Sequence, residues 1–144
     1  MDKSGTRAAY TYLELLVVVT VLAAVTAFAV PRYLALQHRL AARGAASLLT
    51  RALVDARHAA HRRGVRAAVR IDTTSATVTV YATADTLGRY KLGEIFGVAL
   101  SASRDSIAYS PSGLGYGAAN ARFVVTRGAA AETVTVSRVG RVRR

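Results

Sequence analysis

The stretch from Tyr10 to Pro31 is almost wholly apolar, and it constrains the fold of this chain more than any other feature. Its 21 residues before the proline would span about 31 Å as an α-helix, roughly the hydrocarbon thickness of a bilayer. One carboxylate, Glu14, lies near its start; at mid-bilayer it would cost on the order of 2.5–3.5 kcal/mol, and less near the interface. The stretch predicts a membrane-spanning helix in which Glu14 is either solvated among headgroups or paired with a specific partner.

The helical pattern continues beyond Pro31 but changes character. Apolar residues recur there at three- and four-residue steps and form one stripe, made of Leu34, Ala41, Ala45, Leu48, Leu49, Ala52, Leu53, Ala56 and Ala60. Two arginines followed by Gly64 are typical of a helix C-terminus. We therefore expect one helix over about Tyr10–Arg63, with Pro31 favouring a kink and Gly44 a soft point. Its first half is apolar all round and its second half amphipathic.

After Gly64 the period of the pattern changes to two, as in half-buried strands. The clearest predicted strands are Ala76–Tyr81 and Thr133–Ser137; weaker ones are Val69–Asp72, Tyr90–Leu92, Val98–Ser101, Ile107–Tyr109 and Phe123–Thr126. Ser110–Gly113 and Gly115–Gly117 have the composition of turns. The predicted fold class is α+β: a long N-terminal helix, with a transmembrane half and an amphipathic half, packed on a small antiparallel β-sheet domain.

The chain has 20 basic and 8 acidic residues, a formal charge of +12, which favours anionic partners such as phosphates, nucleic acid, acidic lipid or acidic protein. Four guanidiniums, each able to fork onto a phosphate, lie near the C-terminus: Arg138, Arg141, Arg143 and Arg144. This tail is therefore a candidate DNA-binding site, and the alternative is a solvated basic terminus. The absence of cysteine excludes disulfides and thiolate catalysis.

Catalytic and metal sites have little support in the sequence. His58 and His61 share a helix face with Asp55, but the many arginines nearby would repel a cation. Ser110–Gly113 lacks the flanking pattern of a nucleophile elbow. The glycines at 113, 115 and 117 precede a predicted strand, whereas a phosphate-binding loop precedes a helix. We expect no enzyme activity, metal or cofactor.

The start of the chain, with YTYLELL at residues 10–16, resembles the N-terminal signature of type IV pilins and type II secretion pseudopilins. That signature is a short basic leader, a cleavage point, an aromatic residue, a glutamate and an apolar run. With a cut between Ala9 and Tyr10, Glu14 is the fifth mature residue and Pro31 the twenty-second, as in the family. Ala9 stands where the family normally has glycine.

The rest of the chain resembles one branch of that family, the type II secretion protein H and FimT-like minor pilins and pseudopilins. The likeness lies in the helix end Ala56–Gly64, the turn Ser110–Gly113, the strand Arg122–Arg127 and the terminal segment Val134–Arg143. In FimT-like members a Gly-Arg-x-Arg tail is associated with DNA binding during uptake. Gly140–Arg143 matches that pattern, but similar endings occur across the branch.

The resemblance implies a leader at residues 1–9, a transmembrane helix half at 10–31, an amphipathic half at 32–64 and a β-rich domain at 65–144. A prepilin peptidase would cut after Ala9, and Tyr10 would then be N-methylated. Glu14 and Pro31 would serve assembly with other pilins or pseudopilins. The chain would cross the inner (cytoplasmic) membrane once, with its N-terminus in the cytoplasm and its C-terminal domain in the periplasm.

Two observations leave alternatives open. Ala27-Phe28-Ala29 is an acceptable signal-peptidase site behind an apolar core, so an ordinary secreted basic domain is a competing hypothesis. The arginines that follow the span outnumber the two basic residues before it, and the positive-inside rule would place the C-terminus in the cytoplasm. The implied orientation therefore rests on the resemblance. The sequence does not separate a secretion machine from a pilus or DNA-uptake machine.

Overall fold

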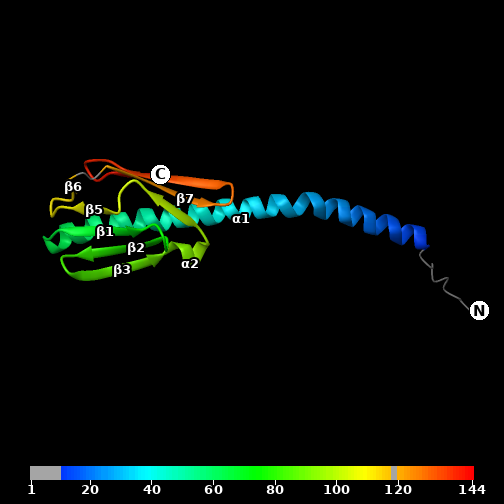
Figure 1. Ribbon diagram of the computed structural model, residues 1–144, viewed down its shortest axis with the longest axis horizontal. Helices are drawn as coiled ribbons and strands as arrows, with labels where there is room; N and C mark the ends of the chain where they lie inside the picture. The colour runs from blue at the N-terminus through cyan, green and yellow to red at the C-terminus, as the bar shows by residue number, and fades with distance from the viewer. Residues whose placement is uncertain (1–10, 118–119) are drawn as a thin grey trace, which may run out of the picture. The chain divides into compact units, whose positions relative to one another are not determined.

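The computed structural model describes residues 11–117 and 120–144 (Figure 1). The predicted processing residues, Ala9 and Tyr10, lie outside the described residues. The chain divides into two compact units, Met1–Leu34 and Ala35–Arg144, and each is described by itself.

The described residues form two helices and nine strands in an α+β arrangement. The elements are α1 (Tyr12–Arg63), β1 (Ala67–Asp72), β2 (Thr77–Ala82), β3 (Asp85–Lys91), α2 (Leu92–Phe96), β4 (Ala99–Ala102), β5 (Ser106–Tyr109), β6 (Gly115–Tyr116), β7 (Ala121–Arg127), β8 (Ala130–Val136) and β9 (Val142–Arg143). The predicted fold class, a long N-terminal helix with an antiparallel β-sheet domain, is confirmed.

Helix α1 is continuous over 52 residues and includes Pro31. A proline removes one backbone hydrogen bond from a helix, and here the helical conformation persists on both sides of it. In the first unit the large apolar side chains are exposed, from Tyr12 at 84% to Leu34 at 46%. Among the described residues, α1 is the helix that is long and apolar enough to cross a membrane.

In the second unit α1 buries a stripe of small residues. The buried members are Ala42, Ala45, Ala46, Leu49, Ala52, Leu53, Ala56, Ala59 and Ala60. The predicted stripe was wrong at Leu34, which is exposed, and it missed Ala42, Ala46 and Ala59. The three missed alanines lie beside predicted members of the stripe, so the buried face is wider than a single stripe at three- and four-residue steps. Alanines make most of this face.

The strands form two antiparallel sheets rather than one. Sheet A has the order β3-β2-β1-β5-β6, and sheet B the order β4-β7-β8-β9 (Figure 1). Both sheets contribute buried side chains to one core with α1: Val69, Val78, Val80 and Tyr109 from sheet A, and Phe123, Val125 and Val134 from sheet B. The amphipathic part of α1 therefore has apolar partners on two sheets.

Gly44 is a packing position and not a soft point. A Cβ built on Gly44 would lie 2.7 Å from Cε1 of Phe96, the last residue of α2. The half-buried Phe96 ring therefore packs directly on the α1 backbone. The C-terminal end of α2 is fixed further by Gly97, whose amide donates to the Gly93 carbonyl at 2.9 Å, and by Arg127, which donates to the Phe96 carbonyl.

Several predicted element boundaries were wrong, mainly at sheet edges. Tyr90–Leu92 is not a strand of its own: the strand is β3, and Leu92 begins α2. Gly115–Gly117 is not only a turn, because Gly115 and Tyr116 form β6 and pair with β5. Ala76 is not in β2; its φ of +47° places it in the turn before that strand.

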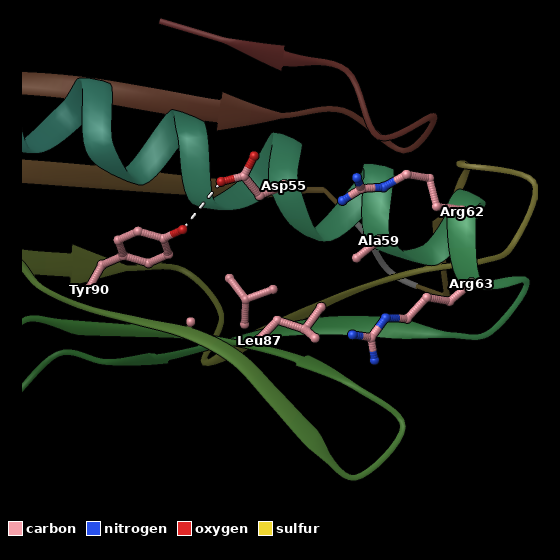
Figure 2. Close-up of a pocket in the computed structure, with 8 residues that line it drawn as sticks. Asp55, Ala59, Arg62, Arg63, Leu87 and Tyr90 are labelled. Carbon is pink, nitrogen blue, oxygen red and sulfur yellow. Dashed lines mark hydrogen bonds between the residues drawn. The ribbon is translucent and has the colours of Figure 1, made fainter.

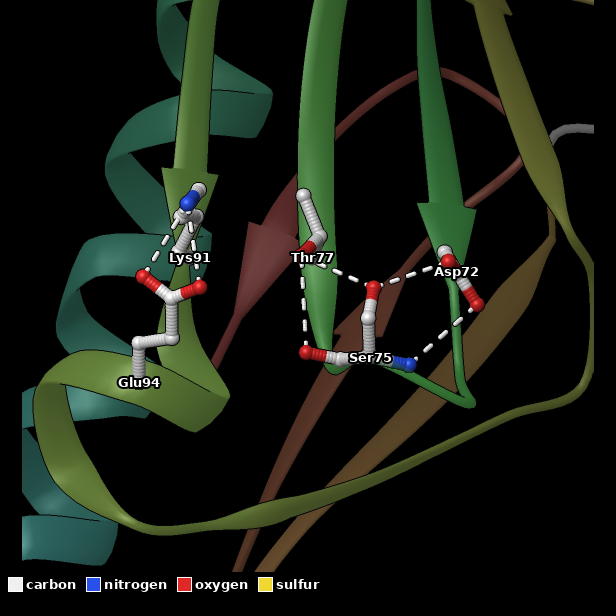
Figure 3. Close-up of polar contacts among 5 residues, drawn as sticks. All are labelled: Asp72, Ser75, Thr77, Lys91 and Glu94. Atoms are coloured by element: carbon white, nitrogen blue, oxygen red, sulfur yellow. Dashed lines mark hydrogen bonds and ion pairs between the residues drawn. The ribbon is translucent and has the colours of Figure 1, made fainter.

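That turn, between β1 and β2, is closed by one carboxylate. Asp72 Oδ1 accepts from the Thr74 amide at 2.9 Å. Asp72 Oδ2 accepts from the Ser75 hydroxyl at 2.8 Å (Figure 3). Hydrogen bonds from Ser75 and Thr74 hold the pKa of Asp72 below its usual range. Lys91 and Glu94 make a 3.0 Å ion pair where β3 passes into α2 (Figure 3). Polar side chains thus fix both turns beside the outer face of sheet A.

Candidate assembly and binding sites

Glu14 lies in the first turn of α1 and takes part in a helix cap. The Glu14 amide donates to the Thr11 hydroxyl at 3.3 Å, so Thr11 caps the helix. A threonine followed three residues later by a glutamate is the sequence pattern of a capping box. The sequence contains this pattern, but the cap was not among the predicted features. Glu14 is exposed, and a carboxylate there also interacts favourably with the positive end of the helix dipole.

Between Leu15 and Val30, α1 offers an apolar surface on which the two threonine hydroxyls are satisfied within the helix. The Thr20 hydroxyl donates to the Leu16 carbonyl at 2.8 Å, and the Thr26 hydroxyl donates to the Leu22 carbonyl at 2.9 Å. Pro31, the second predicted assembly residue, is exposed on the same helix. Such a surface suits lipid or the apolar faces of other helices.

The four arginines near the C-terminus lie on a hairpin and not on a loose tail. The Gly140 amide donates to the Ser137 carbonyl at 2.8 Å, and the Ser137 amide donates to the Arg141 carbonyl at 2.9 Å. β9 then pairs with β8. Val142 packs against the core, so strand alternation directs its neighbours Arg141 and Arg143 outward. The hairpin therefore fixes the backbone positions from which these two arginine side chains extend.

Arg144 differs from the other three arginines of this hairpin. Its Nε lies 3.9 Å from Glu132 Oε2, and Glu132 Oε1 also pairs with Arg43 of α1 at 3.2 Å. In the described part of the chain no ion pair involves Arg138, Arg141 or Arg143, and all three are exposed. Three of the four predicted DNA-binding arginines are thus available for an anionic ligand.

The hairpin is anchored on Tyr109. Gly140 is buried with a φ of +75°, and a Cβ there would lie 3.0 Å from Cε1 of the Tyr109 ring. The Tyr109 hydroxyl is fully buried and has no hydrogen-bond partner among the described residues. Burial raises the pKa of Tyr109 to about 12, and the nearby positive charge of Arg57 lowers it only in part.

We expect alkaline pH to destabilise the second unit through Tyr109. Its pKa is about 12 in the folded chain and about 10 in an unfolded one, so between these values the unfolded chain loses a proton that the folded chain keeps. The free energy of unfolding should therefore fall by up to about 2.7 kcal/mol from pH 10 to pH 12. Tyr109→Phe should remove most of this fall and leave stability near pH 7 unchanged or higher, because the hydroxyl has no partner. Urea unfolding at several pH values measures both effects; an equally steep fall in the variant would contradict the assignment.

The histidines do not form a common site in the structure. His61 Nδ1 lies 3.1 Å from the Pro111 carbonyl oxygen, and His58 is exposed. Asp55, predicted as their neighbour, instead accepts a hydrogen bond from Tyr90 at 3.2 Å. Within residues 11–117 and 120–144 no three histidine or carboxylate side chains gather closely enough to hold a metal ion.

Solved structures with the same fold include a type IV minor pilin and a minor pseudopilin of a type II secretion system. The type IV minor pilin FimU of Pseudomonas aeruginosa superposes with a TM-score of 0.61 at 14% identity, covering 71% of this chain and 86% of that one. The minor pseudopilin EpsH of the Vibrio cholerae type II secretion system gives a TM-score of 0.59 at 15% identity, covering 73% and 93%. No protein-family model and no curated protein matches the chain. The chain therefore has the type IV pilin-like fold of these minor pilins and pseudopilins.

Proposed function

We propose that this chain is a minor pilin or pseudopilin, a non-enzymatic subunit of a type II secretion or type IV pilus filament. One observation carries the proposal: a single helix has an exposed apolar N-terminal part and a C-terminal part buried in a two-sheet domain. The exposed apolar part can lie in a membrane before assembly and can pack against the helices of other subunits afterwards. The folded domain that follows it stays outside the membrane in both states. The shared fold of FimU and EpsH supports this role.

The proposed maturation begins at the leader, residues 1–9. Prepilin peptidase cuts between Ala9 and Tyr10, and the new α-amino group of Tyr10 is methylated. The apolar half at 10–31 remains in the inner membrane until assembly, with the N-terminus cytoplasmic. The amphipathic half at 32–64 and the β-rich domain at 65–144 lie on the periplasmic side. This orientation follows from the requirement that the peptidase reach the leader from the cytoplasm.

In this proposal Glu14 is the assembly contact of the helix. A carboxylate that is costly in lipid finds a positive partner in the α-amino group of Tyr10, on a neighbouring or incoming subunit. Pro31 contributes by leaving one backbone carbonyl without its helical partner, which locally loosens the helix for packing. Recovery of the chain in filaments sheared from cells, with and without Glu14, tests this role.

A second candidate function is DNA binding by the C-terminal hairpin, as in FimT-like minor pilins. The observation that favours it is the outward, fixed placement of Arg141 and Arg143, with Arg138 exposed beside them. Alternate residues on a β-strand lie about 6.5–7 Å apart, and each arginine fork binds one phosphate. Arg144 contributes less in this reading, because Glu132 already holds it.

Changing Arg141 and Arg143 to alanine should weaken the salt dependence of DNA binding: the slope of log K against log salt concentration should become less negative by about two. The full chain in detergent micelles, titrated with a labelled duplex at several salt concentrations, measures this slope. Changing Arg70 and Arg89, both on sheet A, to alanine removes the same charge elsewhere. An equal loss in that control, or no DNA binding by the unmodified chain at moderate salt, contradicts the second candidate function.

A further inference from the structure

A cavity of about 630 Å³ lies between the C-terminal turns of α1 and strands β2 and β3 (Figure 2). Its base is apolar, formed by Ala59 of α1 and Val80 of β2, which are 4% and 2% exposed. Leu87 of β3 adds an aliphatic wall. The cavity therefore offers space for an aliphatic group at the surface of the domain.

The two ends of this cavity carry opposite charges: the acidic end is paired within the chain, whereas one of the two guanidiniums at the basic end is not. At the first end Asp55 Oδ2 accepts from the Tyr90 hydroxyl at 3.2 Å (Figure 2). The same oxygen lies 3.8 Å from Arg51 Nε. Burial, and the adjacent Asp55 carboxylate, raise the pKa of Tyr90, so this hydroxyl stays a hydrogen-bond donor to Asp55. The carboxylate end is thus satisfied.

At the second end lie the guanidiniums of Arg62 and Arg63 (Figure 2). Arg63 Nη1 is 3.3 Å from Asp85 Oδ2, an exposed pair. Arg62 is exposed and has no hydrogen bond or ion pair from its side chain to any other described residue. This end of the cavity therefore presents a guanidinium able to bind an anion with two parallel hydrogen bonds.

Gly88 keeps the cavity open. It faces Val80 across the β2–β3 ladder. Its φ is not in the left-handed region, and a Cβ there would meet the Tyr90 ring at an ordinary 3.4 Å. Neither a left-handed backbone nor packing therefore requires glycine, but the register of the β2–β3 ladder shifts beside it, between Val80 and Tyr81. A glycine inside a strand weakens it and commonly marks a bulge or the close approach of another group, and here it leaves the space beside Val80 open.

We propose that this cavity binds a carboxylate side chain and an adjoining aliphatic side chain of an acidic partner protein. The carboxylate pairs with Arg62, and the aliphatic group covers Ala59 and Val80. A second copy of this chain is a poor occupant, because residues 35–144 carry 17 basic and 6 acidic residues, net +11. A nucleic acid offers phosphates but no aliphatic group for the base of the cavity. The inference concerns this domain alone and does not depend on the proposed filament role.

A short peptide tests the chemistry of the site. We expect the full chain in detergent micelles to bind a fluorescent, end-blocked peptide Gly-Ser-Glu-Leu-Ser-Gly saturably, with affinity that falls as salt rises. The matched peptide with glutamine for glutamate should bind about tenfold more weakly or worse, since it cannot make a charge-assisted pair. Equal binding of the two peptides, or no saturable binding at millimolar peptide, would overturn the proposal.

Three variants locate the binding. Arg62→Gln removes the charge and should weaken the glutamate peptide about tenfold, to the level of the glutamine peptide. Gly88→Val fills the cavity and should abolish saturable binding while the melting temperature stays equal or rises, because valine favours a strand. Arg122→Gln removes an exposed arginine from β7 and should change binding less than twofold. Unchanged binding in both cavity variants, an equal loss in Arg122→Gln, or displacement of the peptide by a DNA duplex from this same site would refute it.

Discussion

Replacing Glu14 by alanine is expected to leave the chain in the membrane and to reduce its recovery in sheared filaments at least about tenfold. Insertion should be retained because the variant removes a charge that lipid disfavours. Assembly should fail because, in the proposed function, the methylated amino group of Tyr10 on a neighbouring subunit would lose its counter-charge, a contact of about 1.5–3 kcal/mol. Membrane fractionation and immunoblots of the sheared fraction measure the two effects separately.

The helix cap offers a second explanation for such a loss, and one variant separates the two. Thr11→Ala removes the hydroxyl that accepts from the Glu14 amide, and so weakens the helix start by about 0.5–2 kcal/mol. It keeps the Glu14 carboxylate. We expect Thr11→Ala to assemble nearly normally. If Thr11→Ala were lost from filaments as completely as Glu14→Ala, the role of Glu14 would be local helix capping and the assembly contact would be contradicted.

Leu49→Ala should lower the free energy of unfolding of the second unit by about 2–5 kcal/mol. Leu49 is fully buried on α1, in the core shared with both sheets, so its truncation leaves a cavity in addition to the lost apolar burial. Leu40→Ala is the matched control: the same change on the same helix, at a side chain that is 57% exposed, should cost less than about 0.5 kcal/mol.

Urea unfolding of the full chain in micelles, followed by the near-ultraviolet signal of its tyrosines, compares these two leucine variants. Similar losses at Leu49 and Leu40 would mean that the amphipathic part of α1 is not the centre of the domain core. A large loss at Leu49 alone supports the amphipathic part of α1 as the centre of that core.

The sequence predicts α1 well because a long apolar run is followed without a break by a stretch with a period near 3.6 residues. The central strands were also predictable, since β2 and β8 alternate apolar and hydroxyl residues. The strands at the sheet edges were not predictable in the same way. β3 begins with exposed, polar residues at Asp85, and its pairing with β2 depends on tertiary context. β9 has two residues, too few for any periodic signal.

The candidate sites were likewise predictable only in part. Residue type and spacing identified Glu14 and the C-terminal arginines, but the contacts around these residues were not predicted. The Thr11 cap could have been predicted from its spacing to Glu14. The anchoring of Gly140 on Tyr109 could not, because these residues lie 31 positions apart and meet only when both sheets have formed. The opening beside Gly88 likewise depends on the register of β3 with β2.

The intact mass of the chain extracted from membranes tests the central claim most directly. The pilin proposal predicts a chain that begins at Tyr10 and carries one additional methyl group, located on its first residue by fragmentation. A cell lacking prepilin peptidase should yield the uncut chain in the same membrane fraction. A chain that begins at Val30, after cleavage behind Ala29, or an uncut and unmethylated chain in cells with an active peptidase, would contradict it.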